Sequence, residues 1–226
     1  MTLRAQAYET FTRHLIDRQL QPGQFVTQRE LAALTGFPLG AIREMIPRLE
    51  AEGLICTIPQ RGLQVAKPDV HVVRDAFQFR EIIEAYALTH FIQTATDAAI
   101  AAQRAALDRV KQAAAGGIGA EVIADAQAVD WGFHDALVDS LGNRLLSDAH
   151  RVNAIRIRMM LPERTTLSAD TLPPAVAEHE AIIAALERRD AAAAQAAMRA
   201  HLAHARRRAL AIEPEPVGPQ FQENRE

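Results

Sequence analysis

The chain has 226 residues, a net charge of −3 and aromatic side chains at only 5% of positions. This length suffices for one large domain or two smaller ones, each with its own core. The negative charge argues against a protein that coats nucleic acid. The charge is uneven, however, because residues 1–67 carry +2 and the remainder carries −5. Any contact with DNA is therefore expected in the N-terminal part.

The cysteine content and the apolar pattern indicate a compartment. Cys56 is the only cysteine in the sequence, so no intrachain disulfide can form, as is usual under reducing conditions. The N-terminus has no apolar run typical of a secretory signal, and no stretch approaches the roughly 18 apolar residues of a membrane span. We therefore expect a cytoplasmic protein that does not interact with a membrane.

The first 35 residues predict two helices. Residues 3–19 place apolar side chains on one helical face, and Pro22 with Gly23 stops that helix. The second helix is short, covering residues 28–34. Thr27 is its expected N-cap and Glu30 follows three residues later, which is the pattern of a capping box.

A third helix and a hairpin follow. Gly36 makes the turn, Pro38 begins the helix and Gly53 ends it. The buried face is predicted from four apolar residues at helical spacing, Ile42, Met45, Ile46 and Leu49. Residues 54–58 and 63–65 form two strands. Two closely spaced helices followed by a hairpin predict a winged helix-turn-helix, whose second helix usually enters the DNA major groove.

The rest of the chain is predicted to be helical. A short hinge at residues 66–69 precedes six helices, expected at 72–93, 98–114, 119–140, 144–160, 175–188 and 191–211. Residues 162–174 are expected to form an exposed connection. The fold class is thus mainly α, with a DNA-binding domain at 1–67, an all-helical domain at 69–212 and a disordered tail at 213–226 that is rich in Pro, Glu and Gln.

Polar residues interrupt several apolar helix faces. Asp130 and His134 lie one turn apart on such a face, and burying them without partners would cost several kcal/mol. His179 precedes two isoleucines by one turn, and His201 lies on the inward face of the last helix. One carboxylate and three imidazoles suit Zn²⁺, Ni²⁺ or Mn²⁺. Spacing alone leaves open satisfied core or surface histidines, or a helix-stabilising Asp130–His134 pair.

Two ordered sets of motifs run along the chain. The N-terminal set is RELA at 29–32, IRE at 42–44, LEAEGL at 49–54 and RG at 61–62. The C-terminal set is REIIE at 80–84, Asp130 with FH at 133–134, GN at 142–143, EH at 178–179 and MRAHL at 198–202. Over about residues 5–210, these motifs resemble the GntR family of bacterial transcription regulators, in the FadR-like subgroup whose C-terminal domain is called FCD.

The resemblance implies an antiparallel bundle of six or seven helices around a metal and effector cavity. It also implies a homodimer whose binding to double-stranded operator DNA is controlled by an effector. Family members that bind a metal use one Asp and three His, and the matching positions here are Asp130, His134, His179 and His201. The resemblance thus favours a divalent metal ion as cofactor, bound by these four residues.

The resemblance also implies a set of DNA contacts. Arg29 and Arg43 are expected to contact bases or phosphates, because the arginine fork can bind guanine in the major groove. Arg61 and Gly62 are expected near the minor groove, and Thr27 and Gly40 complete the predicted set. The alternative for the arginines is a solvated helix face. The sequence departs from the family at two positions that affect specificity, Leu39, where an Arg is usual, and Pro47, which interrupts the recognition helix.

Arg80 is the candidate for holding the carboxylate of an effector, and the alternative is an i,i+4 surface pair with Glu84. Asn153 and Arg156 share one stripe of their helix and are further candidates for the cavity. His204, one turn after His201, is expected at the surface or as a partner of a ligand.

The predicted function is therefore a DNA-binding regulator, most often a repressor of a neighbouring catabolic or transport operon, controlled by a small organic acid at a metal site. Sugar acids, dicarboxylates, hydroxy acids and amino acids all fit. The alternatives are a regulator that senses the metal itself, and a metalloenzyme with a DNA-binding domain. The enzyme is disfavoured, because no general base is spaced beside the ligands.

Overall fold

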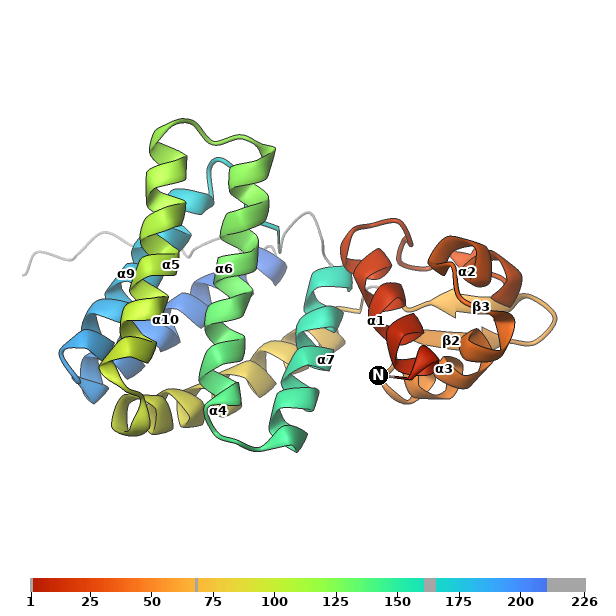
Figure 1. Cartoon of the computed structure of the whole chain (residues 1–226), viewed down its shortest axis with the longest axis horizontal. Coiled ribbons are helices and arrows are strands. Elements are labelled where there is room, and N and C mark those ends of the chain that lie inside the picture. The colour runs from red at the N-terminus through yellow and green to blue at the C-terminus, as the bar shows by residue number, and fades with distance from the viewer. Residues whose placement is uncertain (1, 68, 161–165, 211–226) are drawn as a thin grey trace, which may run out of the picture.

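The computed structural model describes residues 2–67, 69–160 and 166–210. A small N-terminal domain of helices and strands lies beside a bundle of longer helices (Figure 1). The predicted fold class, mainly α with a winged helix-turn-helix followed by an all-helical domain, is confirmed. The tail expected at residues 213–226 lies outside the described residues. No helix in the described ranges is long and apolar enough to cross a membrane.

The N-terminal domain consists of α1 (Leu3–Ile16), β1 (Phe25–Val26), α2 (Gln28–Thr35), α3 (Leu39–Ala51), β2 (Ile55–Ile58) and β3 (Gly62–Val65). The sheet is antiparallel in the order β1-β3-β2. The prediction of two strands missed β1, because two residues are too short to show an alternating pattern. Helix α1 ends earlier than predicted, since Asp17 is its C-cap and Arg18 has a φ of +60°.

Local signals fix the helix-turn-helix. Thr27 Oγ1 accepts a hydrogen bond from the Glu30 amide (3.2 Å), and a carboxylate oxygen of Glu30 accepts one from the Thr27 amide (2.7 Å), so the predicted capping box is present. Gly36 ends α2 with a φ of +74°. Pro38 is the N-cap of α3 and not its first helical residue. Helix α3 continues through Pro47, so the predicted interruption is wrong.

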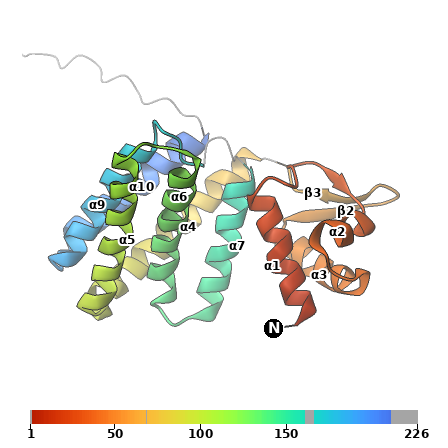
Figure 2. The ribbon, with the colours of Figure 1, turned by 45° about the horizontal axis from the view of Figure 1, so that its top comes forward.

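The C-terminal domain is an up-and-down bundle (Figures 1 and 2). Its helices are α4 (Val70–Thr94), α5 (Asp97–Ala115), α6 (Ala120–Asp139), α7 (Arg144–Met160), α9 (Leu172–Glu187) and α10 (Ala191–Leu210). The exposed connection predicted at 162–174 is wrong at its end, because Leu172 is buried and begins α9. Two prolines follow it in the first turn, where proline suits a helix. Residues 161–165 lie outside the described ranges.

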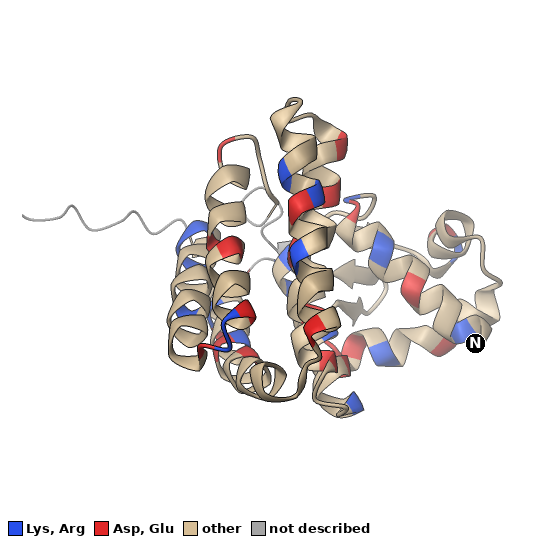
Figure 3. Cartoon of the chain, turned by 60° about the vertical axis from the view of Figure 1, so that its left-hand side comes forward, with Lys and Arg blue, Asp and Glu red and all other residues tan. Residues whose placement is uncertain are grey.

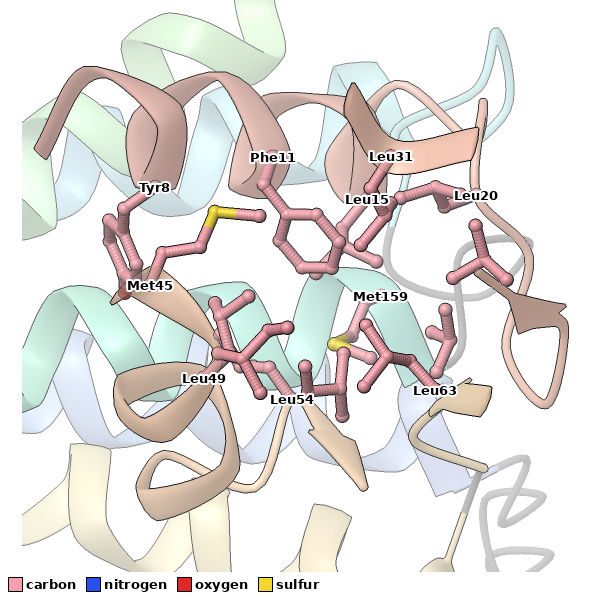
Figure 4. Close-up of a cluster of buried hydrophobic side chains, with 14 of the residues drawn as sticks. Tyr8, Phe11, Leu15, Leu20, Leu31, Met45, Leu49, Leu54, Leu63 and Met159 are labelled. Carbon is pink, nitrogen blue, oxygen red and sulfur yellow. The ribbon is translucent and has the colours of Figure 1, made fainter. Parts of the chain in front are cut away.

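The two domains share one hydrophobic cluster. Phe11 and Leu54 of the N-terminal domain belong to it together with Phe77 of α4 and with Ile157 and Met159 of α7. Figure 4 shows Met159 beside the side chains of the N-terminal domain. Helix α7 also lies between α1 and α6 (Figures 1 and 2). A movement of α7 would therefore displace side chains in both the N-terminal domain and the helical bundle, since packed interiors do not deform freely.

Candidate metal centre

Three helices bring the four predicted ligands together. Asp130 and His134 come from α6, His179 from α9 and His201 from α10. Each residue offers one ligand atom, and these atoms all lie within 4.8 Å of one another. The Nε2 atoms of His134 and His201 are 3.2 Å apart, and Nε2 of His179 is 3.5 Å from a carboxylate oxygen of Asp130. These residues are called the Asp-His₃ cluster below.

Acceptors outside the Asp-His₃ cluster orient each imidazole. Nδ1 of His134 lies 2.7 Å from Glu84 Oε2, Nδ1 of His201 lies 2.8 Å from Glu178 Oε2, and Nδ1 of His179 lies 3.0 Å from the Ala175 carbonyl. The hydrogen bonds at Nδ1 of His179 and His201 assign the proton to that nitrogen. The contact of His134 Nδ1 with Glu84 does not meet hydrogen-bond geometry, but the nearby carboxylate favours the same tautomer, so all three Nε2 lone pairs face the cluster. Nε2 of His179 has no hydrogen-bond partner among the described residues. This arrangement of outer acceptors and inner lone pairs is typical of metal-binding histidines.

The electrostatics of the Asp-His₃ cluster also suit a cation. Burial lowers the pKa of His201 to about 4 and lowers that of His134 as well. Burial alone would raise the pKa of Asp130, but the neighbouring His179 and His134 bring it below its usual value. At neutral pH these two imidazoles are thus neutral and the carboxylate is ionised, which is the state that a divalent metal requires of its ligands. The donor set fits a metal ion, and its chemistry does not select one ion.

Glu84 links the Asp-His₃ cluster to two further helices. Its side chain is fully buried and accepts a hydrogen bond of 2.6 Å from Arg80 Nε, and Nε2 of His150 on α7 lies 3.1 Å from Oε1. Burial would raise the pKa of Glu84, but Arg80 and His134 hold it well below its usual value. The i,i+4 pair of Arg80 and Glu84 therefore exists, but it is buried and not on the surface as the alternative interpretation had it.

His150 was not among the predicted site residues. Its Nδ1 lies 3.1 Å from a carboxylate oxygen of Asp135, so its ring bridges α4 and α6. Its helical spacing could have indicated burial, because His150 lies on one stripe of α7 with the buried residues Ser147, Asn153 and Ile157. Glu178 was recognised only as part of a motif. One of its oxygens contacts the proposed ligand His201 and the other contacts His204, which is half-exposed. His204 therefore reaches the Asp-His₃ cluster only through Glu178.

A small cavity adjoins the Asp-His₃ cluster. Its walls include Arg80, Asp130 and His201 together with Phe77, Gln127, Trp131, Ile157, Thr166, Leu167, Thr171, Ala205 and Arg208. Its accessible space is about 30 Å³, which is room for about two water molecules. Arg80 thus lies where the sequence reading expected it, beside the proposed ligands. Its role toward an effector stays a prediction.

Asn153 and Arg156 do not line this cavity. Asn153 donates a hydrogen bond of 2.9 Å to the Ala76 carbonyl of α4. Arg156 donates two hydrogen bonds, of 2.9 and 2.5 Å, to the main-chain carbonyl of Glu52. Glu52 is the C-cap of α3, the predicted recognition helix. Arg156 therefore joins the two domains and does not face the Asp-His₃ cluster.

The predicted DNA contacts gather around the N-terminus of α3. Thr27, Arg29 and Arg43 line one surface recess with Gln28 and Leu39, and Arg43 Nε donates to Gln28 Oε1 at 3.2 Å. Leu39 makes part of this recess apolar where an arginine was expected. Gly40 is exposed in the first turn of α3.

The wing carries the remaining predicted contacts. Arg61 is exposed before β3, and its guanidinium carbon lies 4.1 Å from the centre of the Phe25 ring. Gly62 has a φ of +93°, and a Cβ there would lie 3.2 Å from the Val26 carbonyl oxygen. Acidic and basic residues are interspersed over the face shown in Figure 3. The predicted role of Arg29, Arg43 and Arg61 in DNA contact stays a prediction.

A winged helix-turn-helix packed against an all-helical domain with a buried Asp-His₃ cluster defines a DNA-binding transcription regulator with a candidate metal site. Residues 3–65 match the family described as bacterial regulatory proteins, gntR family, and residues 75–204 match the FCD domain. The chain belongs to the GntR family and carries a C-terminal FCD domain. The predicted resemblance is confirmed.

Known proteins similar to this chain are regulators and not enzymes. The HTH-type transcriptional repressor GlaR of Escherichia coli (strain K12) is 27% identical over 198 residues, which cover 86% of this chain and 90% of that protein. The structure of E. coli McbR/YncC has a TM-score of 0.75 at 17% identity and covers 90% of this chain and 95% of its own. A GntR regulator from Rhodococcus sp. RHA1 has a TM-score of 0.74 at 18% identity, covering 93% and 99%. These two likenesses support the fold.

Proposed function

We propose that the protein is a transcriptional repressor whose operator binding is controlled by a small carboxylate bound at a metal ion in the Asp-His₃ cluster. The observation that carries this proposal is the convergence of four ligand atoms within 4.8 Å, beside a cavity that Arg80 also lines. The similarity to GlaR, which is named a repressor, supports repression over activation.

The metal would be Zn²⁺, Ni²⁺ or Mn²⁺. Nitrogen and oxygen donors suit all three ions, and the absence of a thiolate among the four ligands disfavours softer metals. Four protein ligands either close a tetrahedral site or leave positions open in an octahedral one. Bound there, the ion would supply a positive charge to which a carboxylate can bind directly.

A carboxylate that enters the cavity would compete for Arg80. In the described structure Arg80 is paired with Glu84, whose oxygens also contact His134 of α6 and His150 of α7. A second carboxylate near Arg80 would repel Glu84 and loosen its hold on His150. Because His150 belongs to α7, effector binding would change the position of that helix.

Helix α7 provides the route from the effector to the DNA-binding domain. Ile157 and Met159 pack in the hydrophobic cluster shared by both domains, and Arg156 holds the Glu52 carbonyl at the end of α3. A second link joins Arg18, just after α1, to Thr166 Oγ1 at 3.1 Å, and Thr166 lines the cavity. Displacement of either link would reorient α3 relative to the bundle.

Repression would require a homodimer, because operator half-sites lie about one helical turn of DNA apart and must be bound together. Ile82 and Tyr86 lie one turn apart on α4, and 62% and 65% of their surfaces are exposed. Such a pair supports an apolar contact between copies. Light scattering of Tyr86→Lys tests it, with Leu145→Lys, an exposed apolar position on α7, as the control. A wild-type monomer would contradict the homodimer.

The experiment that tests the function is selection of an operator from random double-stranded DNA, followed by binding titrations. DNA release would be measured with metal-free protein, with metal alone and with metal plus single organic acids. We expect one class of acid to release the operator only from metal-loaded protein. Release by metal alone would support the metal-sensor alternative. Operator affinity that ignores every acid and every metal state would refute effector control.

A further inference from the structure

The surface recess at the start of α3 has one apolar wall. It measures about 420 Å³ and is lined by Thr27, Gln28 and Arg29 at the start of α2 and by Leu39 and Arg43 in the first turns of α3. Four of these five side chains can form hydrogen bonds, and that of Leu39 cannot. The recess therefore offers a partner both polar groups and a single apolar contact.

Leu39 is not part of the hydrophobic core. It is partly exposed, and it belongs to none of the hydrophobic clusters that the described residues form. The core face of α3 consists of Ala41, Ile42, Met45, Ile46 and Leu49. Leu39 lies instead one turn before Arg43, on the same side of the helix. Its apolar surface is therefore available to a partner.

Gly40, the next residue, leaves space for a close approach. It is exposed and helical, and a Cβ there would meet no atom from elsewhere in the described chain within 4 Å. Glycine destabilises a helix relative to alanine, and the packing of this domain does not require it at this position. Without a side chain, however, Gly40 lets another surface come close to the helix backbone. A close approach is what the short side chain of Leu39 needs to reach a partner.

Arg43 places this surface relative to a base edge. Its Nε donates to Gln28 Oε1 at 3.2 Å, and its two terminal nitrogens form no hydrogen bond with any described residue. Such a guanidinium can bind O6 and N7 of a guanine. Four residues of a helix rise about 6 Å, and base pairs are stacked about 3.4 Å apart. Leu39 and Arg43 would therefore face base pairs one or two steps apart.

The chemistry of Leu39 selects a base. In the major groove, the C5-methyl group of thymine is the apolar group on a base edge, whereas the other bases present hydrogen-bonding groups. A leucine over those groups would leave them buried without partners, which weakens binding. We infer that Leu39 contacts the C5-methyl group of an operator thymine, one or two base pairs from the base pair that Arg43 contacts. This inference rests on operator binding by the proposed repressor, but it does not depend on the metal or the effector.

The test removes the methyl group from the DNA. Single thymines of the selected operator would be replaced by deoxyuridine, which keeps the Watson–Crick edge and lacks the C5-methyl. Fluorescence anisotropy would measure the affinities of the full-length wild type, of Leu39→Ala and of Leu34→Ala. Leu34 is the matched control, because it is an exposed leucine of α2 outside the recess. For the wild type, we expect deoxyuridine at one position of a half-site to lower the affinity about 3- to 5-fold, the value for burial of one methyl group.

Leu39→Ala should bind the thymine and deoxyuridine operators equally, because alanine does not reach the methyl group, while Leu34→Ala should discriminate as the wild type does. Leu39→Arg should prefer guanine at the same position. Since Leu39 lies outside the core, these variants should keep the wild-type fold, which circular dichroism checks.

Two outcomes would overturn the inference and leave the proposed repressor standing. One is an operator in which no thymine is sensitive to deoxyuridine, and the other is equal sensitivity in the wild type and Leu39→Ala. If the wild type selected no operator from random DNA, the inference and the proposed function would fall together.

Discussion

Replacement of His179 by leucine tests the metal site most directly. The imidazole is buried, its Nδ1 is held by the Ala175 carbonyl, and its Nε2 faces Asp130 without a hydrogen bond from any described residue. A metal that binds only the native state contributes about 2.7 kcal/mol when its free concentration is 100 times the dissociation constant. In a chain of this size each kcal/mol raises the melting temperature by about 2–4 °C. Zinc should therefore raise the melting temperature of the wild type by about 5–11 °C.

His179→Leu should lose most of that shift, because one of the four ligands is gone. Without metal the variant should melt close to the wild type, since leucine fills a similar volume and removes the buried His179 Nε2, which has no hydrogen-bond partner among the described residues. The assay is thermal unfolding followed by circular dichroism, after treatment with EDTA and again with added ZnCl₂.

His204→Leu is the matched control. His204 contacts Glu178 but is outside the Asp-His₃ cluster, so this variant should keep the zinc-dependent shift. An equal shift in His179→Leu and the wild type would refute the assignment of His179 as a ligand. Failure of the wild type to retain any metal, measured by mass spectrometry of the dialysed protein, would refute the site as a whole.

Three further predictions follow from the same contacts. Arg156→Gln should keep acid affinity but lose most of the acid-induced operator release. The reason is that the lost contact, about 1.5–3 kcal/mol, is as large as a typical coupling energy between two sites, about 1–3 kcal/mol. Arg151→Gln is the control, and full release in Arg156→Gln would contradict the route through α7. Burial lowers the pKa of His201 to about 4, so the unfolded chain binds a proton at this residue more readily than the folded one. The free energy of unfolding of metal-free protein should therefore hold above pH ~6.5 and fall by about 3 kcal/mol as the pH drops to about 4. Denaturant titrations at several pH values measure this loss. If the free energy of unfolding of His201→Leu falls with pH as steeply as that of the wild type, the assignment to His201 is wrong. Arg43→Gln should lower the affinity for the selected operator about 10- to 100-fold, as expected for one base contact, while Arg109→Gln on α5 should leave it unchanged. Equal affinities of Arg43→Gln and the wild type in filter binding would show that Arg43 lies on a solvated helix face without contacting DNA.

Sequence alone determined the elements whose cause is local. The capping box of Thr27 and Glu30, the turn at Gly36 and the apolar periodicity of α3 lie within a few residues of one another, so they could be read directly. The same holds for Asp130 and His134, whose spacing puts them on one helix face. The bounds of the long helices followed from their periodicity to within a few residues.

Tertiary structure decided which helix faces meet. Spacing offered the pair of Arg80 and Glu84 as an alternative on the surface, but their burial follows from the packing of α4 against α6, α7 and α10. The contact of His150 with Glu84 joins residues 66 positions apart, and β1 exists only because β3 pairs with it. A period of 3.6 residues fixes the face that a helix buries, but it carries no information about the partner across the interface. For that reason the Asp-His₃ cluster could be proposed residue by residue, whereas the acceptors that orient it emerged only in the packed bundle.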